Sequence, residues 1–365
     1  MTETAKSARR PLSRRRKLLF AMVPVTVLLG FAEFGARRFR ASKDYVPQGG
    51  HSYRDQRIDL IRRAFPSEHD ARLGFVPKAD YAGRDNVWGT QVTILPTGLR
   101  SNGAAALPFD RPGVLAVGDS FTFGDQVSDA DTWPAQLEQR LGRPVRNGGV
   151  FGYGFDQSVL RAEKLLTVDR LDVDTLVVSL VPDDLKRAEL SRRYSPKPWF
   201  ALVGDGIELR GVPVPDTSSD NELDRQWLRR AMGYSALLDT LFWNAAPTWW
   251  VGQPREVREH PEGTGLELGK RLVDYVDGVC KERGVRMLLV LQGQRPEMAA
   301  GTPVRAPELV AYARERGIAA VDLASEFAEL VAADPSLDAK WFAGHMTPAG
   351  NRWVAERIAA ELAGR

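Results

Sequence analysis

Ser120 is the first residue of this sequence whose position suggests chemistry. The apolar run Val114–Val117 ends abruptly in Gly118-Asp119-Ser120, and a short loop that contains Gly124 follows. Open α/β sheets bind their ligands beyond the carboxyl ends of the strands, which is where this serine is expected. A serine hydroxyl becomes a useful nucleophile only when an adjacent base accepts its proton. Ser120 is therefore a candidate nucleophile, and the chain must also supply a base and an oxyanion site.

His345 is the candidate base. It lies in a loop just before a predicted carboxyl-terminal helix, which has Thr347 as its N-cap and Pro348 as its first residue. A lone histidine is more often structural, but its place at the end of an α/β region led by a serine favours a catalytic role. The other histidines lie before this region or in an irregular segment: His51, His69 and His260.

A glycine-rich loop follows the second predicted strand, Val145–Asn147, and extends to Gly154. Acyl transfer requires hydrogen-bond donors aimed at the developing oxyanion, and the backbone N–H of Ser120 is one such donor. Glycines in the loop would let its backbone approach a ligand closely. The loop is thus either a second source of donors or an ordinary flexible connection.

Strand-like and helical segments alternate from residue 113 onward, and they must position these groups. Apolar runs that read as strands lie at 114–117, 145–147, 175–180, 286–291 and 318–322. Helical periodicity lies at 132–141, 157–166, 266–283, 307–315 and 323–332. The alternation predicts βαβ units and a parallel sheet with helices on both faces. We therefore expect an α/β fold.

The motifs together resemble those of the SGNH (GDSL) hydrolase superfamily. The resemblance lies in Gly118-Asp119-Ser120, the glycine-rich loop, a polar turn after the third strand and the late His345. Residues 118–124, with the segments 73–77 and 98–100, are similar to membrane-anchored bacterial members associated with cell-surface polysaccharides. The likeness covers roughly residues 70 to 365. It implies a three-layer α/β/α domain with a five-stranded parallel sheet, and ester hydrolysis or acyl transfer without a metal or other cofactor.

The same resemblance names an expected site. Ser120 and His345 are the expected catalytic pair, and the N–H groups of Ser120 and Gly152 are the expected oxyanion donors. Asp119 and Asn147 are expected to lie in the same site.

Two positions depart from the family pattern. Asp183 stands where the family has an Asn that donates to the oxyanion, and an ionised carboxylate cannot donate. It could serve only if burial and the neighbouring Asp184 kept it protonated. The family also places an Asp two or three residues before the histidine, where this chain has Phe342 and Ala343. His345 could be oriented by a backbone carbonyl, giving a Ser–His dyad, or by an acid from elsewhere in the chain. The candidate acids are Asp338, the nearest in sequence, Asp322 and Asp334.

An apolar segment at residues 18–32 precedes all of this and follows basic residues from Arg9 to Lys17. Extension to residue 36 gives about the 20 residues that a membrane span requires. No clean small-x-small site precedes Arg37, which favours an uncleaved signal anchor over a cleaved signal peptide or a buried helix. The positive-inside rule would keep residues 1–17 in the cytoplasm and export the rest. We expect a single-pass protein of the inner (cytoplasmic) membrane with a periplasmic domain.

The expected organisation is a basic tail at 1–17, an anchor at 18–36, a stalk and small β-rich lead-in at 37–110, and an SGNH-like domain at 111–365. The lead-in contains strand-like pieces at 74–77 and 91–95. Residues 195–262 interrupt the SGNH-like domain with an irregular, tryptophan-rich insertion. Its apolar part, residues 237–250, is too short and too polar to span a membrane. The insertion could pack over the sheet, form a lid or aromatic platform beside the site, or touch the membrane surface.

Composition argues against several other classes of protein. A net charge of +3 does not indicate a nucleic-acid partner, and the single cysteine, Cys280, allows no intrachain disulfide. Four histidines and one cysteine do not suggest a dedicated zinc site. No phosphate-binding glycine motif follows the first strand, which argues against a nucleotide-binding flavodoxin-like protein.

The leading hypothesis is an extracytoplasmic serine esterase or O-acyltransferase that acts on acyl, first of all acetyl, esters of a cell-surface glycan. The alternative is a catalytically impaired relative that binds glycan or scaffolds an envelope assembly, and the residues at 183 and 343 favour it.

Overall fold

The computed structural model describes residues 13–42, 47, 50–62, 67–84, 89–218, 226–295 and 305–364. The chain divides into two compact units, one of Met1–Ile58 with Asn221–Gln253 and one of Asp59–Asp220 with Pro254–Arg365. The tryptophan-rich insertion is therefore shared between the units, and residues 221–253 group with the amino-terminal segment. Much of the expected basic tail, residues 1–12, lies outside the described residues.

The second unit is built on a five-stranded parallel sheet in the order β14-β13-β7-β5-β6. Its strands are β5 (Gly113–Val117), β6 (Val145–Asn147), β7 (Val173–Leu180), β13 (Arg286–Leu291) and β14 (Ala319–Asp322). Each predicted apolar run matches one of them, so the predicted α/β class and five-stranded parallel sheet are confirmed. The runs were readable because parallel strands covered on both faces are apolar along nearly their whole length.

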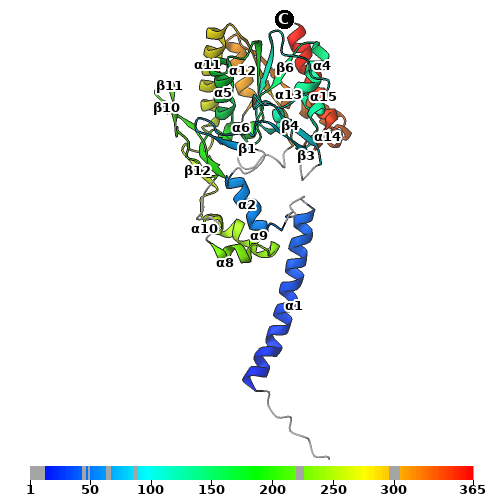
Figure 1. Ribbon diagram of the computed structural model, residues 1–365, viewed down its shortest axis with the longest axis vertical. Helices are drawn as coiled ribbons and strands as arrows, with labels where there is room; N and C mark the ends of the chain where they lie inside the picture. Colours follow the sequence, from blue (N-terminus) through cyan, green and yellow to red (C-terminus); the bar gives the residue numbers. More distant parts are fainter. Residues whose placement is uncertain are drawn as a thin grey trace, which may run out of the picture. The chain divides into compact units, whose positions relative to one another are not determined.

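Helices cover both faces of this sheet (Figure 1). Alternate residues of its strands pack into the two cores on either side. Leu115 and Val117 pack in one core with α5 (Phe155–Glu163), α11 (Gly265–Arg283) and α12 (Pro307–Glu315). Val114 and Ala116 pack in the other core. The helices of that layer are α4 (Trp133–Leu141), α13 (Leu323–Ala333) and α15 (Pro348–Ala363). The three-layer α/β/α arrangement is thus confirmed, and α5 ends in a π-helical turn at Lys164–Val168.

The chain order reverses at β5, because β6 lies on one side of it and β7 on the other. Such a switch point leaves a crevice at the carboxyl ends of the strands, which is where open α/β sheets bind ligands. Three short segments occupy that end of the sheet: α3 (Ser120–Phe123) after β5, the loop after β6, and α6 (Pro182–Arg187) after β7.

Short antiparallel pairs surround the main sheet. The lead-in holds β1 (Ser67–Asp70) with β2 (Gly74–Pro77), and β3 (Tyr81–Arg84) with β4 (Gln91–Ile94). The remaining strands are β8 (Leu190–Arg193), β9 (Ser195–Pro196), β10 (Trp199–Val203), β11 (Gly206–Arg210) and β12 (Glu256–Arg258). The sequence predicted β2 and β4 but not their partners β1 and β3, which are short and polar.

The first unit contains α1 (Arg14–Ala41) and the helices α8 (Trp227–Met232), α9 (Ala236–Ala245) and α10 (Pro247–Val251). It also contains most of α2 (Tyr53–Arg62). Within the described residues, α1 is the one helix long and apolar enough to cross a membrane. This finding fits a single-pass anchor.

Candidate functional site

Ser120 is the first residue of α3, directly beyond the carboxyl end of β5. Asp119 caps this short helix, since its carboxylate accepts a hydrogen bond from the backbone N–H of Phe121 at 2.9 Å. The local sequence therefore fixes the backbone at Ser120. The serine hydroxyl lies 2.9 Å from Nε2 of His345 and 3.3 Å from a carboxylate oxygen of Asp119.

His345 lies in a small hairpin immediately before α15. The hairpin pairs two strands of two residues each, β15 (Phe342–Ala343) and β16 (His345–Met346). Gly344 makes the turn with φ +97°, a conformation that favours glycine. The backbone N–H of His345 donates to the side-chain oxygen of Gln126 at 2.8 Å, and its ring packs on Phe121 with centroids 5.1 Å apart. The predicted loop is therefore a small hairpin that holds the imidazole against the serine helix.

The imidazole of His345 is kept neutral by its surroundings. Burial lowers the pKa of His345 to about 4, with the charge of Asp119 opposing the shift and that of Arg187 adding to it. A neutral imidazole has one nitrogen that accepts and one that donates. Nε2 can therefore accept the Ser120 proton when the ring proton is on Nδ1.

The glycine-rich loop after β6 packs directly against α3. Asn147 organises it, because its side-chain oxygen accepts from the N–H of Gly149 at 3.1 Å and its amide donates to the carbonyl of Phe123 at 3.4 Å. A Cβ at Gly149 would lie 2.4 Å from the backbone nitrogen of Phe123, so only glycine permits this approach. Gly152 has φ +73°, and its carbonyl accepts from Arg193 at 3.1 Å.

Arg187, at the end of α6, connects the segments that follow β5, β6 and β7. It donates to Asp119 at 3.2 Å after β5 and to the carbonyl of Tyr153 at 3.0 Å after β6. After β7 it donates to Asp183 at 2.8 Å and to Asp184 at 2.7 Å. One guanidinium group thus fixes the relative positions of the serine helix, the glycine-rich loop and α6.

The carboxyl groups around Arg187 differ in their environments. Asp184 is fully buried, and its Oδ2 accepts from the backbone N–H of Val181 at 3.0 Å. Burial and the charge of Asp119 raise the pKa of Asp184 well above its usual range, against the opposing charge of Arg187. Asp183 lies in an ion pair with Arg187, and an ionised carboxylate accepts hydrogen bonds rather than donating them.

The acids proposed to orient His345 each bind another group. Asp338 lies on α14 (Ser336–Trp341), and its carboxylate accepts from Arg295 at 2.8 and 3.0 Å. Asp322 caps α13 by accepting from Ser325 at 2.9 Å, and Asp334 accepts from Ser336 at 3.0 Å. The carboxylate of Asp125 lies 3.9 Å from Nε2 of the imidazole, on the side that faces the serine.

Sequence reasoning did not single out Arg187, Asp125 or Gln126. The spacing of Asp183 and Arg187 could have indicated their ion pair, because residues four apart lie side by side on the same face of a helix. Gln126 gives no comparable signal, since its role depends on a positive φ of 72° and on a hairpin far away in sequence.

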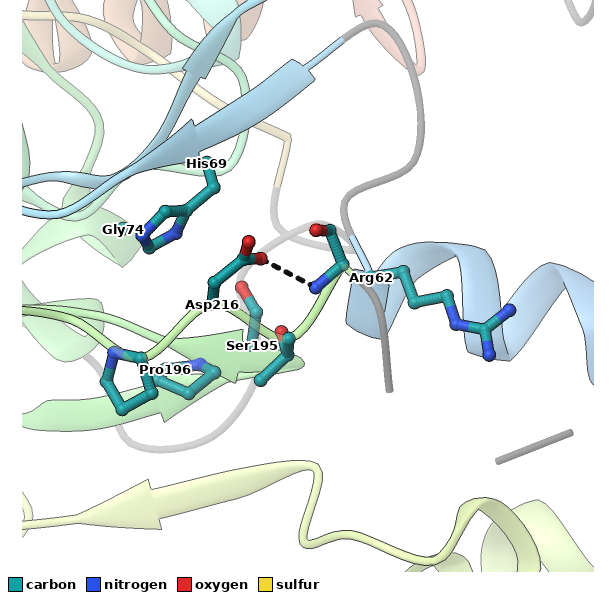
Figure 2. Close-up of a pocket in the computed structure, with 9 residues that line it drawn as sticks. Arg62, His69, Gly74, Ser195, Pro196 and Asp216 are labelled. Atoms are coloured by element: carbon teal, nitrogen blue, oxygen red, sulfur yellow. Dashed lines mark hydrogen bonds between the residues drawn. The ribbon is translucent and has the colours of Figure 1, made fainter. Parts of the chain in front are cut away.

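A separate small polar hollow in the second unit involves other residues. Figure 2 shows His69 and Asp216 directed into it, beside Ser195 and Pro196. The residues that line it do not include Ser120 or His345. The hollow therefore does not contribute to the Ser–His arrangement.

No protein-family model matches this chain, and no curated protein matches it. Similar solved structures include a putative lipolytic protein of the G-D-S-L family from Desulfitobacterium hafniense DCB-2. It has 15% identity and a TM-score of 0.39, over 69% of this chain and 99% of that one. A G-D-S-L lipolytic family member from Veillonella parvula DSM 2008 has 15% identity and a TM-score of 0.38, over 69% and 98%. A GDSL-like lipase from Bacteroides thetaiotaomicron VPI-5482 has 14% identity and a TM-score of 0.35, over 72% and 92%.

Proposed function

We propose that this protein is a serine ester hydrolase or O-acyltransferase of the SGNH type, with Ser120 as nucleophile and His345 as base. The observation that carries the proposal is the 2.9 Å separation of Ser120 Oγ and His345 Nε2 at the switch point of the sheet. A hydroxyl and a neutral imidazole at hydrogen-bond distance are the parts that nucleophilic acyl transfer requires.

The proposed reaction proceeds through an acyl-enzyme. Oγ of Ser120 bonds to the ester carbonyl carbon while its proton moves to Nε2 of His345. The tetrahedral oxyanion is stabilised by the N–H groups of Ser120 and Gly152. The imidazolium then gives its proton to the leaving alcohol as the ester C–O bond breaks. Water or an acceptor hydroxyl attacks the acyl-enzyme, again with His345 accepting and returning the proton.

Arg187 has a positioning role in this proposal. Its hydrogen bonds to Asp119 and to the carbonyl of Tyr153 hold the two segments that bear the proposed oxyanion donors. Its ion pair with Asp183 offsets the negative charge that replaces the family's asparagine. The positive charge of Arg187 near the site also opposes repulsion between Asp183 and the developing oxyanion.

The proposed substrate is an acylated cell-surface glycan, with acetyl as the first candidate acyl group. This part follows from the sequence resemblance alone, as does the choice between water and a sugar hydroxyl as acceptor. The apolar α1 helix and the basic residues before it support an anchor with the catalytic unit outside the cytoplasmic membrane.

A second candidate function is glycan binding or envelope scaffolding by an inactive relative. Two observations favour it. Asp183 is held as an acceptor where a donor is expected, and Asp338 is bound to Arg295. Loss of one oxyanion donor costs roughly 2.7–4 kcal/mol of transition-state stabilisation in a comparable enzyme, which slows a reaction without abolishing it.

Hydrolysis of p-nitrophenyl acetate by the full-length protein in detergent tests the proposal. We expect turnover that Ser120→Ala removes. The matched control is Ser325→Ala, which replaces an exposed serine on α13. Equal rates for wild type and Ser120→Ala would overturn the esterase proposal and favour the scaffold.

A further inference from the structure

Glu33 joins α1 to the start of α9 within the first unit. Its carboxylate accepts from the hydroxyl of Ser235 at 2.7 Å and from the backbone N–H groups of Ala236 at 3.0 Å and Leu237 at 2.9 Å. The first N–H groups of a helix lack acceptors within the helix, and a carboxylate is favourable there. The start of α9 therefore lies level with Glu33 of α1.

The position of Glu33 along α1 sets the depth of that contact. Residues 18–32 are apolar, and such a run is about 22 Å long in a helix. The hydrocarbon core of a bilayer is about 30 Å thick, so a spanning α1 must carry Glu33 to the edge of the core or slightly within it. Arg37 follows one turn later and donates to the carbonyl of Tyr234 at 2.9 Å. The α9 start thus reaches the boundary between headgroups and acyl chains.

A buried charge network links α9 and α10 to α1 and α2. Asp239 on α9 is fully buried and lies 3.3 Å from Arg40 of α1 and 3.2 Å from Arg57 of α2. Its other oxygen accepts from the indole N–H of Trp250 on α10 at 2.9 Å. Separation of these helices would leave a buried carboxylate without its ionic partners, which is strongly unfavourable.

Large apolar side chains lie exposed on and between these helices and α8. The exposed residues include Trp227, with 74% of its surface accessible, together with Leu228, Tyr234, Leu241 and Trp249. Tryptophan and tyrosine are enriched at membrane–water interfaces because their rings are apolar with one polar end. Arg229, on the same short helix as Trp227, donates to the carbonyl of Trp249 and lies 5.3 Å from the centre of its ring. The surface therefore combines aromatic side chains with cations suited to lipid phosphates.

We propose that α8, α9 and α10 form an interfacial surface that inserts into the headgroup region of the membrane that α1 crosses. Trp227, Leu241 and Trp249 enter the boundary with the acyl chains. Arg229 and its exposed neighbour on α8, Arg230, meet phosphate groups. The inference rests on the proposed anchoring by α1 but not on the esterase activity. The part of the tryptophan-rich insertion that forms α8 to α10 is then a second membrane contact. It fixes the tilt of the first unit and its depth in the membrane.

The test uses the full chain with Cys280→Ser as background, reconstituted in vesicles of phosphatidylcholine and phosphatidylglycerol. A nitroxide is attached to one cysteine at a time, and its collisions with oxygen and with a water-soluble nickel chelate are measured. Trp227→Cys and Leu241→Cys report on the proposed surface, so that one reporter remains if the other variant misfolds. Val27→Cys reports on the anchor, and Val203→Cys is a similarly exposed apolar reference in the second unit.

We expect the oxygen-to-nickel collision ratio to be highest at residue 27, intermediate at 227 and 241, and lowest at 203. Ratios at 227 and 241 equal to that at 203, with a high ratio at 27, would overturn the interfacial surface while leaving the anchor in place. Such a result would assign the surface to a protein partner or to water. A low ratio at residue 27 would overturn the anchoring and this inference with it. Both outcomes are independent of ester hydrolysis.

Discussion

The guanidinium group of Arg187 lies 3.2 Å from the carboxylate of Asp119, the residue that caps the helix of Ser120. The same guanidinium binds Asp183, which stands at the expected oxyanion position, and the buried Asp184. A single cation therefore offsets three acidic groups around the proposed nucleophile.

Removal of that cation should destabilise the second unit. Arg187→Gln leaves Asp119 and Asp184 buried without their ionic partner, and such losses cost about 3–5 kcal/mol. We expect a clear fall in the thermal unfolding midpoint, measured by circular dichroism on the full chain. Arg295→Gln, which removes a more exposed ion pair with Asp338, is the control and should have little effect. Equal midpoints for Arg187→Gln and wild type would show that the cluster is not stabilising.

Replacement of Asp183 by asparagine should increase the rate of ester hydrolysis. Asp183→Asn restores an amide donor and removes a negative charge, so we expect kcat to rise by about tenfold or more. Asp183→Ala removes the charge without adding a donor and separates the two contributions. A fall in kcat for Asp183→Asn would mean that the ionised carboxylate, through its pair with Arg187, has a task of its own.

The pH dependence should reflect the lowered pKa of His345. Activity requires a neutral imidazole, so kcat/KM should be constant above about pH 5 and fall as the pH drops through about 4. An acidic limb near pH 6.5 would instead indicate an imidazole with an ordinary pKa.

The free energy of unfolding should also depend on pH through His345, and it should decrease as the pH falls. The folded pKa of His345, about 4, is below its unfolded value, so the unfolded chain binds the proton first. This contribution to stability is complete above about pH 6.5 and is lost as the pH falls toward 4. His345→Gln should flatten that part of the stability profile, measured by urea unfolding at several pH values.

Gln126 should act as a positioning residue for the base. Its side-chain oxygen holds the backbone N–H of His345, so Gln126→Ala should lower kcat by up to about tenfold and leave KM nearly unchanged. Gln139→Ala, on an exposed face of α4, is the matched control. Equal losses in both variants, or a change in KM alone, would contradict this role.

The sheet was predictable because Val114–Val117 and the other buried strands are apolar along their length. The serine at the end of β5 was predictable for the same reason, since Gly118 and Asp119 end the apolar run abruptly. The strands Ser67–Asp70 and Tyr81–Arg84 were missed because their residues are polar or small. The local sequence pattern was therefore sufficient for the buried strands of the main sheet. It was insufficient for the short, partly exposed strands of the lead-in.

Long-range contacts account for what the sequence did not indicate. Arg187 acquires its role from acids and a carbonyl on three separate segments, and only the spacing to Asp183 is local. The grouping of residues 221–253 with the amino-terminal segment depends on Glu33 and Asp239, whose partners are far away in sequence. Neither relationship follows from periodicity.

The central claim is that His345 accepts the proton of Ser120. The most direct test is the rate of covalent labelling by a fluorophosphonate, with the modified peptide identified by mass spectrometry. We predict an adduct on Ser120 in the wild-type protein. In His345→Gln we predict that the labelling rate falls by about a hundredfold or more. No adduct on Ser120, or equal labelling rates with and without the imidazole, would contradict the account.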